Sequence, residues 1–309
     1  MSTHYRRQCL SIVALLLTMA VAAYQVVRLA ADDAGPVRRI EGGHFEASGV
    51  VHVPGSDGLL FVDDSAAGQV FWMRLDANGV QQGPARSVAL GAEVTDLEGI
   101  TTDGTLFYVV GSQSKKRGAS GDGLVRFAFD PSTLRVDRVE RITGLNAWLA
   151  GHVPELAGTA SRPGGTALNI EAIAWDPGRQ RLLLGLRDPV VDGHALVVPV
   201  RLADGRFTRE SLRLDGGRAL RLPLDGAGIR SLEHDARTGG FKVITGPGPG
   251  RKGLDFRVVE WRGGESREDI TPVSVYPRRL KPEGIAVATL GGRQVSVVVF
   301  DVGRFAVTD

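Results

Sequence analysis

The tripeptide Glu98-Gly99-Ile100 recurs, with changes, at four other places in this 309-residue chain. The five copies are Ser48-Gly49-Val50, Glu98-Gly99-Ile100, Glu171-Ala172-Ile173, Arg230-Ser231-Leu232 and Glu283-Gly284-Ile285. Their first residues, called lead residues here, are separated by 50, 73, 59 and 53 positions. Such intervals are too long for helical solenoid repeats but suit the four-stranded blades of a propeller. The repeats therefore predict an all-β fold, a β-propeller.

The spacing favours five blades, because only the 73-residue interval has room for a sixth. The last repeat is short: after Glu283 the chain has room for about three strands before Asp309, whereas the other repeats have room for four. We expect residues 37–41 to supply the missing strand. Strands from both ends of the chain would then close the ring and leave no open sheet edge. Residues 37–309 are accordingly expected to form a single propeller domain.

Strand signals fill the intervals between the lead residues. Runs rich in Val, Leu and Phe are bounded by Gly, Pro, Asp or Asn, and 41 glycines supply the tight turns that many short strands need. Almost continuously apolar runs, such as Leu182-Leu183-Leu184, are typical of strands buried on both faces. Residues 145–156 differ, because the spacing of Trp148, Leu149, Val153 and Leu156 is roughly helical. We expect one short helical insertion there.

The N-terminus has the pattern of an export signal. Arg6 and Arg7 precede an apolar run from Cys9 to Ala23, which ends in Val21-Ala22-Ala23, small residues suited to cleavage. We expect residues 1–31 to be a signal peptide or an uncleaved signal anchor. The protein would then be periplasmic or secreted, and attached to the inner membrane only if the anchor is retained. Cys9 is the only cysteine, so the remaining chain has neither disulfides nor thiolate chemistry.

Charge and composition limit the classes of partner that the sequence predicts. The formal net charge is +2, and the basic residues are scattered, so no nucleic-acid surface is predicted. The histidines lack zinc-ligand spacing, and no nucleophile elbow of the G-x-S-x-G type occurs. We therefore expect a monomer whose partner is a small molecule.

The lead residues are the main candidates for a functional site. Equivalent positions of successive blades converge on the propeller axis, so Glu98, Glu171, Glu283 and Arg230 should meet there. Two interpretations remain open. The carboxylates form a ring that binds a cation or polar ligand, or they pair with Arg187 and Arg230 and hold the blades together. Both can hold at once.

The ends of the second strands form a related set, since antiparallel strands return them to the lead residues. They are Asp63-Asp64, Ser112-Gln113, Arg187-Asp188, Gly246-Pro247 and Asp301. The alternative reading of these residues is ordinary turn chemistry. The resulting ligand-binding candidates are Glu98, Glu171, Arg187, Arg230, Glu283 and Ser112. The candidate metal ligands are Asp63, Glu98, Glu171, Glu283 and Asp301.

Longer stretches around these repeats resemble a bacterial family of exported proteins of unknown function. The resemblance rests on residues 96–100 with 108–112, on 168–171 through 183–189 (including Leu184-Gly185-Leu186-Arg187), on Gly228-Ile229-Arg230-Ser231-Leu232-Glu233, and on Pro282-Glu283-Gly284-Ile285-Ala286. More distantly, the Glu-Gly-Ile element is similar to that of phytase-like (esterase-like) propellers. That resemblance implies acidic residues that bind calcium and phosphate esters around the channel. Ala172 departs from the pattern, which prefers Gly.

Two function classes follow. In the first, the mouth of the channel binds a small polar or anionic ligand through Arg187, Arg230 and Ser112. In the second, the acidic residues hold calcium, and the protein hydrolyses phosphate or carboxyl esters without a nucleophilic Ser or Cys. We favour binding, because three Glu and two Arg at one site nearly neutralise one another. An inward excess of carboxylates would favour the metal.

Overall fold

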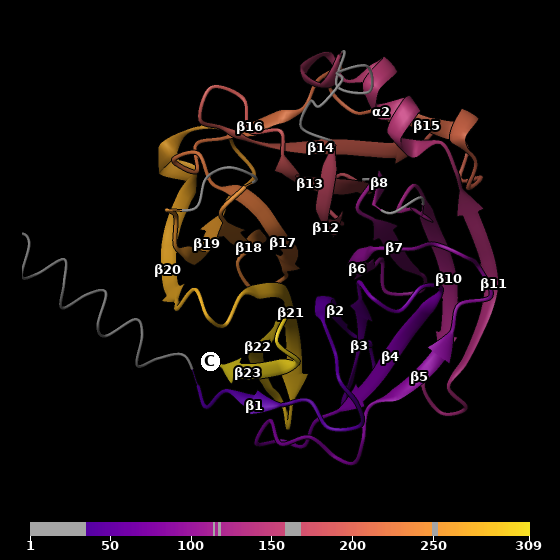
Figure 1. Cartoon of the computed structure of the whole chain (residues 1–309), viewed down its shortest axis with the longest axis vertical. Helices are drawn as coiled ribbons and strands as arrows, with labels where there is room; N and C mark the ends of the chain where they lie inside the picture. The colour runs from indigo at the N-terminus through magenta and orange to yellow at the C-terminus, as the bar shows by residue number, and fades with distance from the viewer. Residues whose placement is uncertain (1–34, 114, 117–118, 158–167, 249–252) are drawn as a thin grey trace, which may run out of the picture.

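The computed structural model describes residues 35–113, 115–116, 119–157, 168–248 and 253–309. Five antiparallel sheets stand around a common centre, so the fold is a five-bladed β-propeller (Figure 1). The five-blade prediction is confirmed. Within the described residues of the 73-residue interval, the one additional sheet is a two-stranded hairpin, which is not a sixth blade. Residues 1–31, expected to be an export signal, lie outside the described residues.

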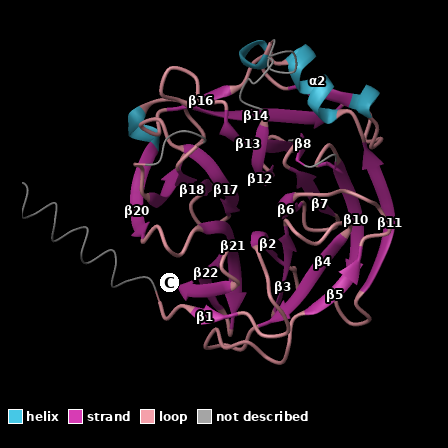
Figure 2. Ribbon diagram, in the orientation of Figure 1, coloured by secondary structure: helices cyan, strands magenta, loops and turns pink. Residues whose placement is uncertain are grey.

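Each blade runs outward from its innermost strand, and Figure 2 shows that strands make up most of the ring. Blade 1 is β2 (Ala47–His52), β3 (Gly58–Asp63), β4 (Gln69–Arg74) and β5 (Arg86–Ala89). Blade 2 is β6 (Leu97–Thr102), β7 (Phe107–Gly111), β10 (Leu124–Asp130) and β11 (Arg135–Ile142). Blade 3 is β12 (Asn169–Asp176), β13 (Arg181–Asp188), β14 (Ala195–Leu202) and β15 (Leu212–Leu214), with β16 (Leu220–Leu222) also paired to β14.

Blades 4 and 5 complete the ring. Blade 4 is β17 (Gly228–Asp235), β18 (Gly240–Gly246), β19 (Phe256–Trp261) and β20 (Ile270–Tyr276). Blade 5 takes three strands from the C-terminus, β21 (Pro282–Leu290), β22 (Arg293–Phe300) and β23 (Arg304–Thr308). Its outermost strand is β1 (Arg38–Arg39), which pairs with β23 (Figure 1). The expectation that a strand from the N-terminal side completes the last blade is thus confirmed.

The core consists of five apolar layers, one between each pair of neighbouring blades. Side chains alternate along β3: Leu59 and Phe61 pack toward blade 5, while Leu60 and Val62 pack toward blade 2. All four are fully buried. This double burial explains why the middle strands read as continuous apolar runs in the sequence.

The predicted helical insertion is α2 (Leu145–His152) followed by a 3₁₀ turn, η1 (Pro154–Leu156). It lies at the periphery of the ring, where Leu145, Trp148 and Leu149 join the layer between blades 2 and 3 (Figure 2). Two further 3₁₀ turns, η3 (Arg209–Ser211) and η4 (Arg267–Asp269), and a small hairpin of β8 (Lys115–Lys116) and β9 (Ala119–Ser120) complete the described elements. No helix in the described part of the chain is long and apolar enough to cross a membrane.

Candidate functional site

The lead residues occupy the same structural position in all five blades. Each is near the start of an innermost strand, at a shift in the pairing register with the second strand. Opposite Glu98, for example, the pairs step from Leu97–Gly111 to Gly99–Val110 and leave Glu98 without a partner. Such a β-bulge turns the extra side chain away from the regular alternation of the strand. Five bulges therefore direct five lead side chains to one cavity.

The small residue after each lead residue is required by close contact between neighbouring inner strands. A Cβ atom on Gly99 would lie 3.0 Å from the backbone nitrogen of Ile173 in blade 3. A Cβ atom on Gly284 would lie 2.9 Å from the carbonyl oxygen of Ser48 in blade 1. In blade 4 the equivalent residue, Ser231, instead accepts a hydrogen bond from the Ile285 N–H at 3.0 Å. The repeat thus determines both the direction of the lead side chain and the close spacing of neighbouring inner strands.

All five lead residues line one cavity of about 540 Å³ at an end of the central channel. Four of the five second-strand ends contribute to its wall, as expected, through Asp64, Arg187, Pro247 and Asp301. Leu254 and Phe256 add an apolar section, and Arg278 and Lys281 add two cations. The cavity therefore offers charged groups of both signs beside an apolar surface.

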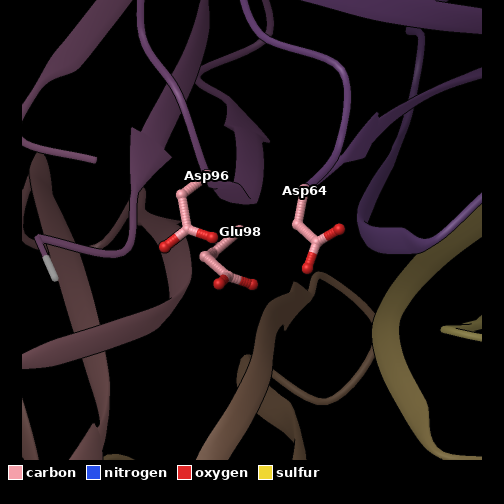
Figure 3. Close-up of side chains that lie close together, drawn as sticks. All are labelled: Asp64, Asp96 and Glu98. Atoms are coloured by element: carbon pink, nitrogen blue, oxygen red, sulfur yellow. The ribbon is translucent and has the colours of Figure 1, made fainter. Parts of the chain in front are cut away.

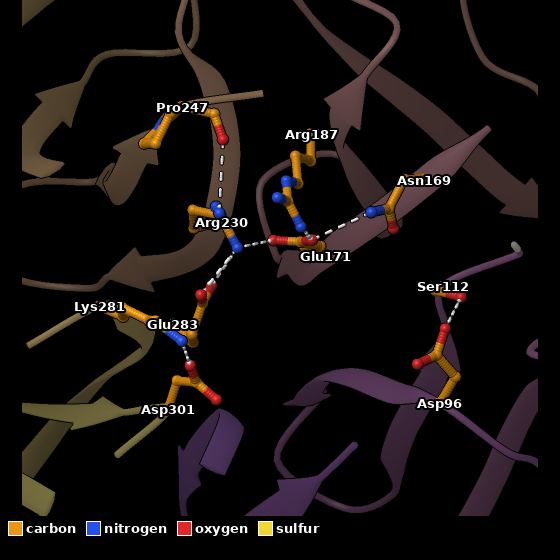
Figure 4. A network of polar contacts seen from close by, with 10 residues as sticks. All are labelled: Asp96, Ser112, Asn169, Glu171, Arg187, Arg230, Pro247, Lys281, Glu283 and Asp301. Atoms are coloured by element: carbon orange, nitrogen blue, oxygen red, sulfur yellow. Dashed lines mark hydrogen bonds and ion pairs between the residues drawn. The ribbon is translucent and has the colours of Figure 1, made fainter. Parts of the chain in front are cut away.

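On the side of blades 3, 4 and 5, the charged groups pair with one another (Figure 4). Glu171 binds Arg187 at 2.6 Å through one oxygen and Arg230 at 2.8 Å through the other. Nη1 of Arg230 also donates to both oxygens of Glu283, at 2.7 and 2.8 Å. The guanidinium of Arg230 lies 5.5 Å from the centre of the Phe256 ring. Lys281 pairs with Asp301 nearby. We call this set of contacts the ion-pair network.

Exposure separates the two arginines of the network. The side chain of Arg230 is 8% exposed, whereas that of Arg187 is 28% exposed. Burial alone would lower the pKa of Arg230, but Glu171 and Glu283 outweigh it, so its pKa is raised. Burial raises the pKa of Glu283 to about 8, although Arg230 opposes this effect. Arg230 therefore stays charged and links three blades, while Arg187 is the arginine that a ligand can reach.

On the side of blades 1 and 2, three carboxyl groups gather (Figure 3). One oxygen from each of Asp64, Asp96 and Glu98 lies within 4.8 Å of the others, and Asp64 and Asp96 flank Glu98. Glu98 is only 7% exposed. Within the described residues its carboxyl group has no hydrogen-bond or ion-pair partner. Burial, followed by the nearby carboxylates Glu171, Asp96, Glu283 and Asp64, raises the pKa of Glu98 well above its usual range. We call these three residues the acidic cluster; their oxygens can hold a metal ion.

The structure places the predicted site residues in different roles. Glu98, Glu171, Arg187, Arg230, Glu283 and Asp301 all line the cavity. Asp63 does not, because its carboxylate accepts hydrogen bonds from the backbone of Glu46 and Ser65, each at 2.9 Å. Ser112 is fully buried and its hydroxyl donates to Asp96. Of the five candidate metal ligands, only Glu98 belongs to the acidic cluster.

Asp64 and Asp96 are the residues that sequence reasoning missed. Asp64 directly follows Asp63 at the end of β3. Which of the two lines the cavity depends on which one accepts the hydrogen bonds of the turn. Asp96 lies two positions before a lead residue, as do Glu46, Asn169 and Lys281, so a polar residue at that position was a usable signal. Its φ of 55° lies in the left-handed region, which the sequence did not reveal.

Residues 151–301 match a family described as "Protein of unknown function (DUF3616)". This match confirms the resemblance to a family of unknown function over blades 3 and 4 and part of blade 5. It assigns no activity. No curated protein matches the chain.

Among solved structures, the chain is similar to the holo form of the PQQ domain of pyranose dehydrogenase from Coprinopsis cinerea. The two share 13% identity over 88% of this chain and 95% of that one, with a TM-score of 0.51. Glutaminyl cyclase from Myxococcus xanthus shares 14% identity over 89% of this chain and 94% of its own, with a TM-score of 0.46. At such identities the likeness to the dehydrogenase domain supports the propeller fold and nothing about activity.

Proposed function

We propose that the protein is a binding propeller whose central cavity holds a small polar or anionic ligand together with a divalent cation. The observation that carries the proposal is the acidic cluster: three carboxyl groups within 4.8 Å, with Glu98 nine-tenths buried and without a hydrogen bond from any described residue. A buried carboxylate is costly unless a proton or a cation neutralises it. The cation proposal extends the expected set of ligands to Asp64 and Asp96.

Calcium is the proposed ion because the cluster offers only carboxylate oxygens. Calcium takes six to eight oxygen ligands in flexible geometry, so three carboxylates leave positions for water and for oxygens of a ligand. Arg187, on the opposite side of the cavity, is the proposed contact for an anionic group, since a guanidinium can bind carboxylate or phosphate through two N–H groups. Arg230 orients Glu171 and Glu283 and does not itself bind the ligand in this proposal.

Thermal unfolding with calcium and with chelator tests the cation site. Calcium at a hundredfold excess over its dissociation constant should stabilise the protein by about 2.7 kcal/mol, and chelator should reverse the shift. Glu98→Gln should abolish the shift. Glu171→Gln should lower the unfolding midpoint equally with and without calcium, because it removes a partner of Arg230. Glu210→Gln, at a side chain that is 75% exposed, is the matched control and should respond as the wild type does.

Equal midpoints in calcium and chelator would remove the cation from the proposal. The ligand part is tested separately by screening sugar acids and phosphate esters with calcium present. Arg187→Gln should weaken binding of anionic members of the screen more than binding of neutral ones. An anion preference that survives Arg187→Gln contradicts the assigned contact.

A second candidate function, a calcium-dependent hydrolase of phosphate or carboxyl esters, uses the same geometry. A bound cation would supply a water of lowered pKa, and Arg187 would hold the anionic part of the ester. Turnover of aryl phosphate or aryl acetate that requires calcium and disappears in Glu98→Gln would support this candidate. Calcium binding without turnover supports binding alone.

We also propose that the propeller functions outside the cytoplasm. The support is the sequence of residues 1–31, with Arg6 and Arg7 before an apolar run. A reporter fused after Asp309 should be active in the periplasm. The mass of the mature protein determines whether the signal is cleaved. A reporter active only in the cytoplasm contradicts the location.

A further inference from the structure

A second cavity, of about 650 Å³, lies beside the strand pair that closes the ring. Its wall includes Arg39 of β1 and Arg304 of β23, together with His44, Glu46 and Ser65 from the segment around the start of blade 1. It shares Lys281 and Asp301 with the central cavity. Because these two residues pair with each other, they contribute little net charge to either cavity.

Arg39 and Arg304 face each other directly in the closing pair. The register of β1 and β23 sets Arg39 opposite Arg304 and Arg38 opposite Phe305. Residues directly opposite in an antiparallel pair have neighbouring side chains on the same face, and like charges in this position repel. Both arginines are exposed. Within the part of the chain that the structure describes, neither guanidinium forms an ion pair or a side-chain hydrogen bond. Two adjacent cations without a partner form one wall of a cavity.

The other charges of this cavity do not balance them. With Lys281 and Asp301 paired, the remaining carboxylate in the wall is that of the exposed Glu46, which can offset one of the two arginines. Ser65 is held in the turn by Asp63, to which its hydroxyl donates at 2.5 Å. The cavity therefore keeps an excess of positive charge and ten guanidinium N–H donors at the ring closure, about five per arginine.

We propose that this cavity is a second binding site, specific for a small anion that carries a phosphate or carboxylate group, which Arg39 and Arg304 bind together. The planar fork of each guanidinium fits the oxygens of such groups. An anion between the two arginines replaces their repulsion with two attractive contacts. This site is separate from the proposed cation site and does not depend on it.

Binding at this site is coupled to closure of the propeller. The pair β1–β23 contains only two residue pairs, Arg38–Phe305 and Arg39–Arg304, and one of them has like charges. An anion that bridges Arg39 and Arg304 connects the N-terminal strand to the C-terminal strand. The anion should therefore stabilise the folded state, because it binds only where the two strands are paired.

Inorganic phosphate is the probe for the first experiment. Thermal unfolding of the whole protein is compared in phosphate and in chloride at equal ionic strength, so that general screening is the same. We expect phosphate to raise the midpoint of the wild type by several degrees, with saturable binding by calorimetry. Arg39→Gln and Arg304→Gln should each lose at least about tenfold in phosphate affinity. Arg86→Gln, at an exposed arginine of the outer strand β5, should keep the full response.

Arg304→Glu separates the site from a mere loss of stability. It places opposite charges across the closing pair, so the protein should melt above the wild type without phosphate and should no longer respond to phosphate. A phosphate response that is equal in the wild type and in both Gln variants overturns the proposal. Equal wild-type midpoints in phosphate and chloride overturn it as well, as does a phosphate response retained by Arg304→Glu.

Discussion

The two sides of the central cavity use the same structural position for different purposes. On the side of blades 3 to 5, the lead residues Glu171, Arg230 and Glu283 bind one another within 2.8 Å. On the side of blades 1 and 2, the lead residue Glu98 is equally buried but lies beside two more carboxyl groups. The bulge aims the side chain in every case, so the charged residues that surround the lead side chain determine the outcome. An arginine makes a cross-link between blades, and a second acid makes a site that can accept a cation.

The largest predicted effect breaks the ion-pair network. Arg230→Gln leaves the buried carboxylates of Glu171 and Glu283 without their shared cation, and it should lower the free energy of unfolding by about 3–5 kcal/mol. Denaturant unfolding at pH 9, where Glu283 with its pKa of about 8 is ionised, measures the change. Arg257→Gln is a control in the same blade, because the Arg257 side chain is 49% exposed and lies 4.0 Å from Asp225. A loss for Arg230→Gln no larger than that of the control would show that the network does not stabilise the fold.

Glu233 is a buried carboxyl group that belongs neither to the ion-pair network nor to the acidic cluster. Its effect on the pH dependence of stability therefore serves as a reference for both. Glu233 lies on β17, and burial raises its pKa from 4.5 to about 8, although a hydrogen bond from the backbone of Val287 opposes the shift. Between these two values the folded state binds the proton that the unfolded state has lost. This group therefore makes stability fall as pH rises from about 4.5 to 8, by about 1.4 kcal/mol per pH unit where the difference is complete.

Denaturant unfolding between pH 5 and pH 8 checks this slope. Glu233→Gln should reduce the slope of the free energy of unfolding against pH by the contribution of one titrating group. Glu283, with a pKa of about 8, contributes in the same direction and should leave a residual slope in the variant. A Glu233→Gln profile that is parallel to the wild type contradicts the raised pKa.

On the acidic side, removing a charge should help the metal-free protein. Glu98→Gln replaces a buried carboxyl group, surrounded by other acids, with a neutral group of similar shape. With chelator present at pH 8, we expect the free energy of unfolding to rise by about 1 kcal/mol. The opposite signs of Glu98→Gln and Arg230→Gln are the sharpest test of the contrast between the two sides. A destabilised Glu98→Gln protein in chelator would mean that Glu98 has a structural partner.

The smallest effect is expected where the network reaches solvent. The side chains of Lys281 and Asp301 are 54% and 25% exposed, and surface ion pairs contribute little. Lys281→Gln should change the free energy of unfolding by less than about 1 kcal/mol in the same denaturant assay. A loss comparable to that of Arg230→Gln would extend the network's structural role to the rim of the cavity.

The sequence was sufficient for the parts of the structure that repeat. The five lead residues could be identified because each blade needs a bulge followed by a small residue, and Gly99 and Gly284 have no room for a side chain. The closing strand could be predicted because the last repeat was short. In the structure, Arg38 of this closing strand lies opposite Phe305 of β23.

The parts that do not repeat were harder. The sequence marked Asp63-Asp64 as a strand end, and Asp63 was predicted as the metal ligand. The hydrogen bonds of the turn show instead that Asp63 is used locally and that Asp64 lines the cavity. The pairing of Glu171 with Arg187 and Arg230 was weighed as an alternative to a ligand site, and the distances show that the pairing is real. Sequence alone could not show which acid lacked a cationic partner, because that depends on how neighbouring blades are placed.

The closing pair also has a consequence for the order in which the chain folds. The strand β1 is made early on the ribosome, but its partner Phe305 follows Arg38 by 267 residues. Contacts at such separation form late and slowly. Until residues 282–308 have been synthesised, blade 5 does not exist, and the inner strands of blades 1 and 4 each lack a neighbour. The nascent propeller should therefore remain open, and sensitive to protease, until β21, β22 and β23 have emerged from the ribosome.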